Sequence, residues 1–338
     1  MPIIRYLPFS LLIPLLGVAQ SPALERYTFT EPHMGTTARI VLYAPDESSA
    51  RKAAAKAFAR IAELNLVMSD YNPNSELMRL CAKAGGEPVP ISADLYDVLE
   101  KSLAFVKVTE GALDITISPV VRLWRRAKRT REMPSEAEIK QALALVDFRN
   151  IKLDSQRRTA QLLVMGMLLD LGAIGKGYAA DAALAVLRKH GFPRALVALG
   201  GDIAVGDAPP NAKGWRIGIA PLKNPGADPT HYLLVTNAGV STAGDAEQVA
   251  EIGGNRYSHI IDPKTGIGQI GRRSVTVIAP NAMMSDALDT AVCVMGLDRG
   301  LKLIESLDSV AALCVFETKT KIVTAQSTRF AKLLVTDR

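Results

Sequence analysis

The stretch Leu169-Asp-Leu-Gly-Ala-Ile-Gly-Lys-Gly-Tyr178 places three glycines, an acid and a lysine between an apolar run and an alanine-rich segment. Glycines allow tight turns and a close backbone approach to a ligand, and amide groups at the start of a helix can face phosphate oxygens. The spacing is neither G-x-G-x-x-G nor the P-loop pattern, so it predicts neither a Rossmann fold nor a P-loop. From these residues alone, a phosphate-binding turn with Lys176 as its cation and an ordinary strand-to-helix turn are both open.

Helical and strand-like patterns alternate irregularly around this turn. Helical spacing follows it over 175–190 and ends at Gly191, a typical C-terminal glycine. Before it, partial alternation over 27–43 predicts a strand after Met34-Gly-Thr36, and apolar spacing over 48–67 predicts an alanine-rich helix. Further elements predicted in this half are a helix from Glu76, a helix from Ser92 to Val108, an extended segment over 111–118 leading into a helix at Pro119, a helix opened by Ser135, and two strands around a turn at 154–159.

The C-terminal half is richer in strands. They are predicted at 195–203, where Gly200-Gly201 breaks the strand, at 215–220, 231–236, 240–243 and 275–279, and in a hairpin formed by 310–318 and 321–324. A helix follows the strand at 275–279 and begins near Ser285. Because strands and helices mix without a steady βαβ rhythm, the pattern favours a mixed α+β fold, with largely antiparallel sheets and packed helices, over a doubly wound sheet.

The composition describes a chain that folds around its own core. Its 338 residues are 48% hydrophobic and 22% charged, which is enough for one large core or two medium ones. No repeat or long linker divides the chain, so we expect a single domain over residues 20–338. Cys81, Cys293 and Cys314 are odd in number and form no C-x-x-C pair, which indicates buried free thiols and argues against a disulfide framework or a zinc site.

Residues 1–19 form a separate segment. A basic residue precedes the apolar run 6–18, and small residues close the run at Gly17-Val-Ala19. This is the pattern of a secretory signal peptide, so we expect cleavage after Ala19, a mature chain that begins at Gln20, and a periplasmic location. An uncleaved membrane anchor is the alternative, but the run is short for a membrane span. No cysteine follows the run to support a lipid anchor.

The formal net charge is +6, from 40 Lys and Arg against 34 Asp and Glu. Much of the excess is local, because six cations fall within ten residues: Arg122, Arg125, Arg126, Lys128, Arg129 and Arg131. A solvated helix face is the plain interpretation, and a surface for an acidic partner or an anionic lipid is the alternative. Trp124 is the only aromatic residue in the run, so base stacking and nucleic-acid binding are not indicated.

The segment Ser285-Asp-Ala-Leu-Asp-Thr290 contains the residues of a candidate metal site. With Ser285 as the N-cap of a helix, Asp286 and Thr290 lie four residues apart and share one face. A carboxylate and a hydroxyl are hard oxygen ligands suited to Mg²⁺, which keeps waters and takes further ligands from phosphates. Asp289 is a candidate second ligand. The alternative is that Asp286 and Asp289 only stabilise the helix N-terminus through its dipole.

A histidine lies in the predicted strand Tyr257-Ser-His-Ile-Ile-Asp262, which ends in a Pro-Lys-Thr-Gly turn. His259 could serve as a titratable base, yet a lone histidine beside two isoleucines is also typical of a hydrogen-bonded core residue. Asp262 is an odd number of positions further along, so it points to the opposite face and is not an obvious partner for orienting the ring. The spacing leaves both interpretations of His259 open.

Taken together, these motifs resemble the ApbE family of flavin transferases, which move FMN from FAD onto a threonine of a target protein. The resemblance extends from about Tyr27 to Gly296, and the motifs occur in the family's order. They are Met34-Gly-Thr36, Ser69-Asp-Tyr71 with Ser75-Glu76, Gly111-Ala-Leu-Asp114 with Pro119 and Leu123-Trp124, the stretch from Asp170 to Asp181, Leu199-Gly-Gly-Asp-Ile203, His259-Ile-Ile-Asp-Pro263 with Thr265-Gly266, and Ser285 to Thr290.

The resemblance implies roles for individual positions. Asp286 and Thr290 match the family's magnesium-binding acid and hydroxyl, and a backbone oxygen at Ala173 completes the protein ligands. His259 matches a histidine placed near the reacting phosphates, which makes it the expected catalytic residue. The positions implied to contact FAD are Met34, Tyr71, Ala112, Leu113, Asp114, Asp170, Lys176 and Ile260.

The chain departs from the family's pattern at two places. It has Ala173-Ile-Gly175 where the family has Gly-Ile-Ala, which is a swap of small residues. It has Thr242-Ala-Gly-Asp-Ala246 where the family has Thr-Ser-Gly-Asp-Tyr. The second difference removes a hydroxyl and an aromatic ring from the expected flavin contact.

The implied activity is Mg²⁺-dependent transfer of FMN from its substrate FAD to a protein threonine, with release of AMP. Mg²⁺ would neutralise the pyrophosphate and stabilise the leaving group, while His259 or a nearby acid would take the threonine proton. The implied acceptor is a threonine that faces the periplasm, as in a subunit of a membrane redox complex. Two alternatives stay open: an FAD pyrophosphatase that releases FMN and AMP, and a non-catalytic flavin-binding carrier.

Overall fold

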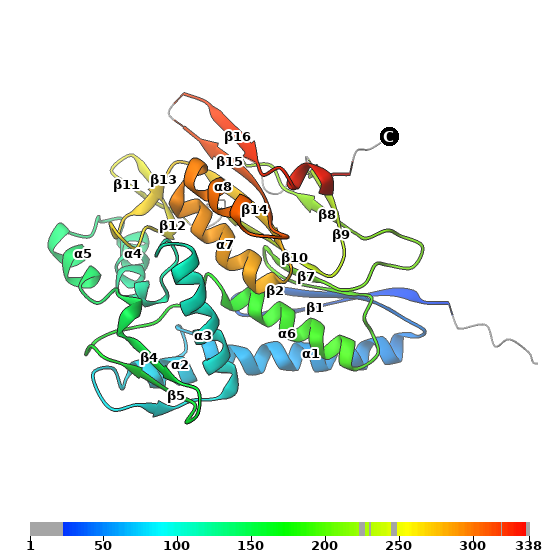
Figure 1. Ribbon diagram of the computed structural model, residues 1–338, viewed down its shortest axis with the longest axis horizontal. Coiled ribbons are helices and arrows are strands. Elements are labelled where there is room, and N and C mark those ends of the chain that lie inside the picture. Colours follow the sequence, from blue (N-terminus) through cyan, green and yellow to red (C-terminus); the bar gives the residue numbers. More distant parts are fainter. Residues whose placement is uncertain (1–22, 223–226, 230, 245–248, 319, 336–338) are drawn as a thin grey trace, which may run out of the picture.

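The computed structural model of the protein describes residues 23–222, 227–229, 231–244, 249–318 and 320–335. Among these residues, an eight-stranded sheet forms the centre, in the order β1-β2-β6-β7-β10-β14-β15-β16 (Figure 1). Its strands are β1 (Glu25–His33), β2 (Thr36–Ala44), β6 (Ala195–Leu199), β7 (Asp202–Val205), β10 (Ala238–Gly244), β14 (Arg273–Ala279), β15 (Ala311–Glu317) and β16 (Ile322–Gln326). Every neighbouring pair in this sheet is antiparallel.

This sheet buries both of its faces, because residues along one strand alternate between two cores. In β6, Val197 and Leu199 join the core under the helices, while Leu196 and Ala198 join the core on the other face. The first face is covered by α1 (Glu47–Met68), α6 (Gly175–Lys189), α7 (Ala282–Met295) and α8 (Leu297–Ser306). The second is covered by the hairpin of β8 (Trp215–Ile219) and β9 (His231–Val235), with the 3-10 helix η3 (Phe330–Leu333).

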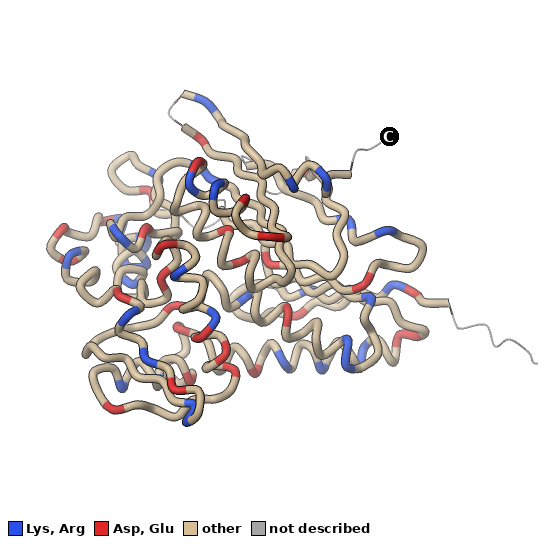
Figure 2. The backbone as a smooth tube through the Cα atoms, in the orientation of Figure 1, with Lys and Arg blue, Asp and Glu red and all other residues tan. Residues whose placement is uncertain are grey.

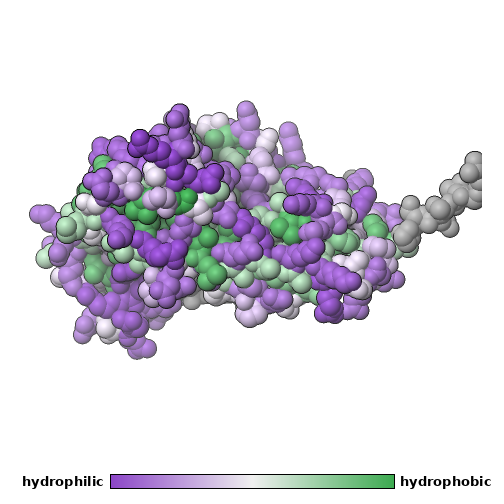
Figure 3. Space-filling model, turned by 90° about the horizontal axis from the view of Figure 1, so that it is seen from below, coloured by the Kyte–Doolittle hydropathy of each residue, from purple (hydrophilic) through white to green (hydrophobic). Residues whose placement is uncertain are grey.

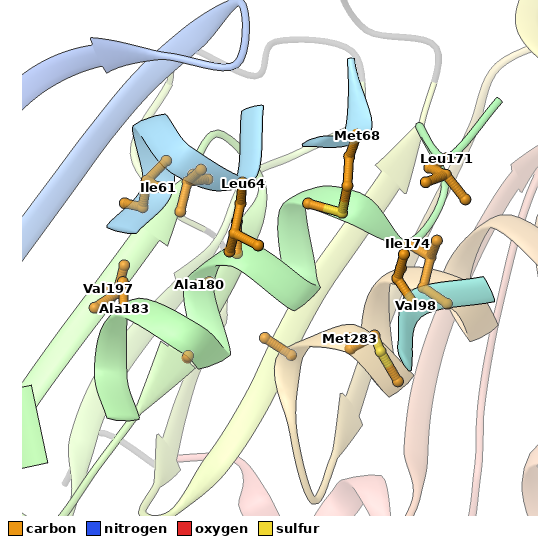
Figure 4. Packing of buried hydrophobic residues seen from close by; sticks show 14 of the residues in the cluster. Ile61, Leu64, Met68, Val98, Leu171, Ile174, Ala180, Ala183, Val197 and Met283 are labelled. Atoms are coloured by element: carbon orange, nitrogen blue, oxygen red, sulfur yellow. The ribbon is translucent and has the colours of Figure 1, made fainter. Parts of the chain in front are cut away.

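Helix α6 lies between α1 and α7, and its small residues allow close packing on both sides. Figure 4 shows Ala180 and Ala183 of α6 among larger buried side chains of α1 and β6. Toward α7, a Cβ added at Gly177 would lie 2.3 Å from the carbonyl oxygen of Ala282. The starts of α6 and α7 therefore meet through their backbones, and only glycine fits at this crossing.

A smaller region extends from the main sheet. It contains α2 (Glu76–Cys81), α3 (Ala93–Val108), α4 (Ser118–Thr130), α5 (Glu136–Leu143) and the 3-10 helices η1 (Ile115–Ile117) and η2 (Phe148–Asn150), together with the small sheet β3 (Val89–Pro90)-β5 (Thr159–Leu162)-β4 (Ile151–Asp154). A further sheet, β11 (Val249–Ile252)-β12 (Asn255–Ile261)-β13 (Gly268–Ile270), contacts α4 and α7. The indole N–H of Trp124 in α4 donates to the carbonyl oxygen of Gly266 at 2.8 Å and anchors α4 beside this sheet.

The structure confirms the mixed α+β fold with largely antiparallel sheets. The three longest predicted helices are present as α1, α3 and α6, and β15 and β16 form the predicted hairpin. Cys81, Cys293 and Cys314 are buried thiols that form no disulfide within the described residues, as predicted. No helix in the described part of the chain is long and apolar enough to cross a membrane. The leader predicted at 1–19 lies outside the described residues, so the domain boundary at 20 stays a prediction.

The predicted start of α7 is wrong. The helix begins at Ala282, and its N-cap is Asn281, whose side chain accepts a hydrogen bond from the Met284 N–H at 2.9 Å. Ser285 is not the cap, because its hydroxyl donates to the carbonyl oxygen of Ala282 at 2.9 Å, within the helix. Asp286 therefore lies beyond the first turn of α7.

Two further local predictions need correction. The segment at 111–118 was expected to be extended but contains η1, because the Asp114 carboxylate accepts from the Thr116 N–H at 2.9 Å and turns the chain. Strand β12 ends one residue before Asp262, so this acid is not part of the strand. The Asp262 carboxylate instead accepts from the Lys264 N–H at 2.8 Å in the turn that follows.

Candidate functional site

The glycine-rich turn before α6 is fixed at both of its ends. The Asp170 N–H donates to a carbonyl oxygen of η1 at 2.8 Å, and the Asp170 carboxylate accepts from the Gly172 N–H at 2.7 Å. Helix α6 has no side-chain N-cap, and the Gly177 N–H near its start donates to the Asp286 carboxylate of α7 at 2.9 Å. The turn that carries Ala173 is thereby tied to the helix that carries Asp286.

Buried carboxylates from β7 and α7 meet beside this turn. Asp202, Asp286 and Asp289 are 3%, 3% and 1% exposed. The Lys176 ammonium lies 2.6 Å from Asp202 and 3.8 Å from Asp286. Ser241 of β10 is the register partner of Asp202, and its hydroxyl is hydrogen-bonded to that acid and lies 2.5 Å from Asp289. We call these five residues the acid cluster.

The acid cluster brings three carboxyl groups and one ammonium group together in a place that excludes water. Burial, reinforced by the charge of Asp202, raises the pKa of Asp286 to about 7. Burial and the neighbouring carboxylates raise the pKa of Asp289 well above its usual range. Burial alone would lower the pKa of Lys176, but attraction by Asp286 and Asp202 outweighs it and raises that pKa. A further cation would relieve this imbalance.

The donor atoms at this place fit a hard divalent cation such as Mg²⁺. They are carboxylate and hydroxyl oxygens, and the Thr290 hydroxyl lies 3.3 Å from the Asp289 carboxylate. Within the residues that the structure describes, no group of three or more His, Cys, Asp or Glu side chains could hold a metal ion. A cation held by Asp286, Thr290 and the Ala173 carbonyl would therefore take its remaining ligands from water or phosphate, as Mg²⁺ usually does.

A second charged cluster lies at the opposite end of the turn. Arg125 of α4 donates to Asp70 at 2.6 Å and to Asp170 at 3.2 Å. Its guanidinium carbon lies 4.1 Å from the centroid of the Tyr71 ring. Tyr71 is 75% exposed, so most of its ring is open to a ligand. We call Asp70, Tyr71, Arg125 and Asp170 the arginine cluster.

The turn between β1 and β2 borders a cavity of about 710 Å³, which residues of α1 line on its other side. Met34 and Gly35 form this turn with φ angles of 50° and 73°. The Gly200 N–H donates to the Thr37 carbonyl oxygen at 3.4 Å, which ties the hairpin to the β6–β7 turn. Asp202 of the acid cluster is the first residue of β7. The β6–β7 turn therefore supports both the hairpin that borders the cavity and the acid cluster.

Comparison with known proteins identifies the family of the chain. The model of the ApbE family matches residues 34–314. The chain belongs to the ApbE family. The FAD:protein FMN transferase of Treponema pallidum is 33% identical over 310 residues, which cover 87% of this chain and 86% of the relative. The FAD:protein FMN transferase of Haemophilus influenzae is 33% identical over 313 residues, which cover 90% of both chains.

Solved structures of ApbE proteins have the same fold. The flavin transferase ApbE from Vibrio cholerae matches with a TM-score of 0.82 and 28% identity, over 92% of this chain and 99% of that chain. The ApbE protein of Thermotoga maritima matches with a TM-score of 0.82 and 27% identity, over 91% of this chain and 99% of that chain. The sheet order and helix layer described above therefore form the ApbE fold.

The structure brings many of the predicted site residues of this ApbE-family chain together around the turn before α6. Lys176 and Asp286 belong to the acid cluster, and the Thr290 hydroxyl contacts Asp289 of that cluster. Ala173 lies in the turn itself, Asp170 and Tyr71 belong to the arginine cluster, and Met34 lines the cavity. Asp286 and Asp289 are buried beyond the first turn of α7, so a purely electrostatic role at the helix N-terminus does not explain them. Lys176, expected to contact FAD, is engaged by two acids of the cluster.

The segment Ala112-Leu-Asp114, also expected to contact FAD, lies in the interior. Its residues are buried, with exposures between 3% and 8%. The Asp114 carboxylate accepts from the Phe148 N–H at 3.3 Å as well as from Thr116, and burial raises the pKa of Asp114 above its usual value. These bonds hold η1, whose carbonyl oxygen in turn accepts from the Asp170 N–H. The segment therefore supports the turn through η1.

His259 and Ile260 lie on β12, which contacts both α4 and α7. The His259 side chain is exposed, so the interpretation as a core histidine is wrong. Ile260 is buried in the core that α7 shares with β14 and β15. The family departure at 242–246 lies partly outside the described residues, and its first three positions belong to β10.

Sequence reasoning gave no role to Asp202, Ser241, Asp70 or Arg125. An acid directly after a Gly-Gly break in a strand was a usable signal for Asp202. Arg125 was hidden in the basic run, which Figure 2 shows along α4, and which we interpreted as a solvated face. That interpretation is wrong at Arg125, which is partly buried between two acids, whereas the next residue, Arg126, is exposed and pairs with Glu138.

Proposed function

We propose that this ApbE-family chain is an FAD:protein FMN transferase, which moves FMN from FAD to a threonine of an acceptor protein and releases AMP. The relatives from Treponema pallidum and Haemophilus influenzae bear this name and support the activity. The observation that carries the proposal is the acid cluster, in which buried acids of α7 and the Lys176 ammonium lie beside a glycine-rich turn. A site of this kind is suited to a nucleotide pyrophosphate bound with a divalent cation.

Mg²⁺ belongs to the proposal as the cation. Asp286, Thr290 and the carbonyl oxygen of Ala173 would hold it, with Asp289 as a further acid nearby. When bound, the ion would neutralise the pyrophosphate and stabilise the AMP leaving group. The raised pKa values of Asp286 and Asp289 mean that ionising both acids is unfavourable without a cation, which supports a cation at this position.

The remaining side chains would bind and orient FAD. Lys176 stays protonated at neutral pH, because the acids around it raise its pKa, and it supplies a positive charge for phosphate oxygens. The exposed ring of Tyr71 offers a face for a flat ring of FAD. Met34 at the cavity and Asp170 at the start of the turn complete this part of the proposed site.

His259 is the proposed general base. It would accept the proton of the threonine hydroxyl while the threonine oxygen bonds to the FMN phosphorus. The bond from that phosphorus to the bridging oxygen breaks, and AMP leaves with the electron pair. The exposed position of His259, on a strand that contacts the helix of the buried acids, supports this role.

The proposal is tested by mixing the protein with FAD, Mg²⁺ and an acceptor protein, and by measuring AMP and the mass of the acceptor. Transfer produces AMP and an acceptor that carries one FMN, and an acceptor with threonine replaced by valine stays unmodified. AMP and free FMN with an unmodified acceptor would instead establish an FAD pyrophosphatase. Bound FAD without AMP would establish a flavin carrier, which the changes at Ala243 and Ala246 leave as a competing function.

Export is a separate part of the proposal. The pattern of residues 1–19 supports a cleaved leader and a periplasmic protein, whose acceptor would be a subunit of a membrane redox complex. Mass spectrometry of the protein from the periplasmic fraction should find Gln20 at its N-terminus. An intact Met1 in that fraction would refute cleavage.

A further inference from the structure

The arginine cluster joins segments that are far apart in the sequence. Asp70, in the loop after α1, is 55 residues from Arg125, and Asp170, in the turn before α6, is 45 residues from it. The two carboxylate side chains are only 10% and 11% exposed. Placing two acids in such a position is unfavourable unless they are paired, so the arginine is required by its surroundings.

Arg125 also fixes an exposed aromatic ring. Its guanidinium covers one face of Tyr71, and its bond to Asp70 holds the backbone at the neighbouring residue. The Ser69 hydroxyl oxygen accepts from the Tyr71 N–H at 3.3 Å and so helps to hold the loop. With one face covered by Arg125 and the residue 75% exposed, the opposite face of the ring is the one open to a ligand.

Asp170 connects Arg125 to the other part of the site. One of its carboxylate oxygens accepts from Gly172 inside the turn, and the other accepts from Arg125. The same turn contains Ala173 and leads to Lys176, which pairs with Asp202, and to Gly177, whose N–H donates to Asp286. A single guanidinium therefore sets both the orientation of the ring and the position of the turn.

We infer that Arg125 is a positioning residue for FAD, which acts through Tyr71 and Asp170. It holds the Tyr71 ring ready to stack on a flat ring of FAD, and it holds the turn in register with the pyrophosphate. The forked geometry of arginine is needed, because two carboxylates and a ring are engaged at once. This inference rests on the proposed function, since it assumes that FAD occupies the site.

The test compares Arg125→Gln, Arg125→Lys and Tyr71→Leu with the wild type and with Arg126→Gln. Arg126 is the matched control, because it is the next residue of α4 and, among the residues that the structure describes, its side chain pairs with Glu138 of α5 and not with Asp70 or Asp170. For each protein, thermal stability, the Kd for FAD, FMN and ADP, and the fluorescence of saturating bound flavin are measured. The three ligands show whether the ring that stacks on Tyr71 is the flavin or the adenine.

We expect Arg125→Gln to weaken FAD binding about tenfold, which corresponds to about 1.4 kcal/mol, while Arg126→Gln leaves it unchanged. If Tyr71 stacks on the flavin, the bound flavin should also become brighter in Arg125→Gln, because an unfixed tyrosine quenches it less. Arg125→Lys keeps the charge without the fork, so it should fold even if Arg125→Gln does not, and it should still bind FAD several-fold more weakly.

A double-mutant cycle separates positioning from general stability. If Arg125 acts through the ring, Arg125→Gln should cost much less affinity in a Tyr71→Leu background than alone. Equal costs in both backgrounds, or wild-type affinity in a folded Arg125→Gln protein, would overturn the inference while the proposed function stands. A wild-type protein that binds no FAD would overturn both.

Discussion

Helices α7 and α4 both carry charged residues of the site, and they do so in opposite ways. Helix α7 buries Asp286 and Asp289 among apolar neighbours, while α4 turns most of its cations to solvent and buries residues such as Trp124. Burying a charge is costly, whereas exposing one costs little. A buried charge therefore points to function, and an exposed charge does not, unless it lies at the boundary as Arg125 does.

The distribution of charge over the surface agrees with this contrast. Hydrophilic residues dominate the face in Figure 3, with hydrophobic patches between them, so an additional exposed cation there is unremarkable. In the acid cluster, by contrast, Lys176 is the one cation among three buried acids, and it pairs with Asp202 and Asp286. This contrast raises the question whether the reaction depends on the buried acids of α7, which substitutions can answer.

Asp286→Asn should produce the largest effect, a loss of AMP release of at least about 10³-fold at saturating Mg²⁺. The asparagine keeps an oxygen that can accept from the Gly177 N–H, so the contact between α6 and α7 survives. Thermal stability should be unchanged or higher, because an unfavourable buried charge is removed. The rate of AMP release, measured beside a melting curve, decides the matter. Wild-type turnover by this variant would show that the buried charge of α7 is not used.

The second prediction concerns stability against pH in the absence of metal. A carboxyl group with a raised folded-state pKa stabilises the fold fully below its unfolded pKa, and this contribution is lost as the pH rises through the folded pKa. For Asp286 the window runs from 3.8 to about 7. Relative to Asp286→Asn, the wild type should lose up to about 4 kcal/mol of unfolding free energy across this window.

This dependence can be measured by denaturant unfolding in the presence of a chelator. Asp286→Asn is the control, because groups outside the acid cluster, such as Glu138 with a pKa lowered to about 2, titrate alike in both proteins. The Asp286 charge also raises the pKa of Asp289, so the difference between the two proteins reports these two acids together. Parallel stability curves for the two proteins would show that burial does not shift Asp286. The contrast between buried and exposed charge would then lose its energetic basis.

His259 tests the strand that lies between the two helices, because β12 contacts both α4 and α7. If His259 is the general base, His259→Asn should lower the rate of AMP release about 10²-fold. The residue is exposed, so FAD affinity and thermal stability should stay close to those of the wild type. Added imidazole should restore part of the rate in His259→Ala. Unchanged specific activity in the folded variant would move the base to another group, with Asp262 and Asp289 as the candidates.

The sequence was most informative where one residue decided a local structure. Apolar spacing located α1, Gly191 marked the end of α6, and Ser92 and Ser135 were correctly identified at the starts of α3 and α5. It failed where two residues competed for one role, as Asn281 and Ser285 did at the start of α7. Both side chains can accept a hydrogen bond from a helix N–H. Which of them caps α7 depends on how the N-terminal end of α7 packs against α6.

The clusters of the site could be predicted only in part. Asp286 and Thr290 stood out because they lie four residues apart and share a helix face, and the family pattern named both of them together with Ala173. The pairing of Ser241 with Asp202 depends on the register of β7 and β10, which no local pattern fixes. Arg125 meets acids 55 and 45 residues away, and its neighbours in the basic run carry the same charge, so periodicity could not single it out.

The smallest predicted effect concerns how the two helices begin. Helix α4 has no side-chain cap, whereas the Asp181 carboxylate of α6 accepts from the N–H groups of Ala282 and Met283 at 2.9 Å each, in the first turn of α7. Asp181→Ala should therefore cost about 1–2 kcal/mol of unfolding free energy, as loss of a helix cap does.

In Asp181→Ala the rate of AMP release should fall only slightly, although the unfolding free energy decreases. Asn281 still caps α7, and the Gly177–Asp286 bond still joins the two helices, so AMP release per folded molecule should fall by less than about tenfold. Asp181→Asn retains one acceptor oxygen and should lose only part of the stability. A loss of activity as large as that of Asp286→Asn, in protein that remains folded, would mean that the start of α7 must be fixed within a narrow range for the buried acids to work.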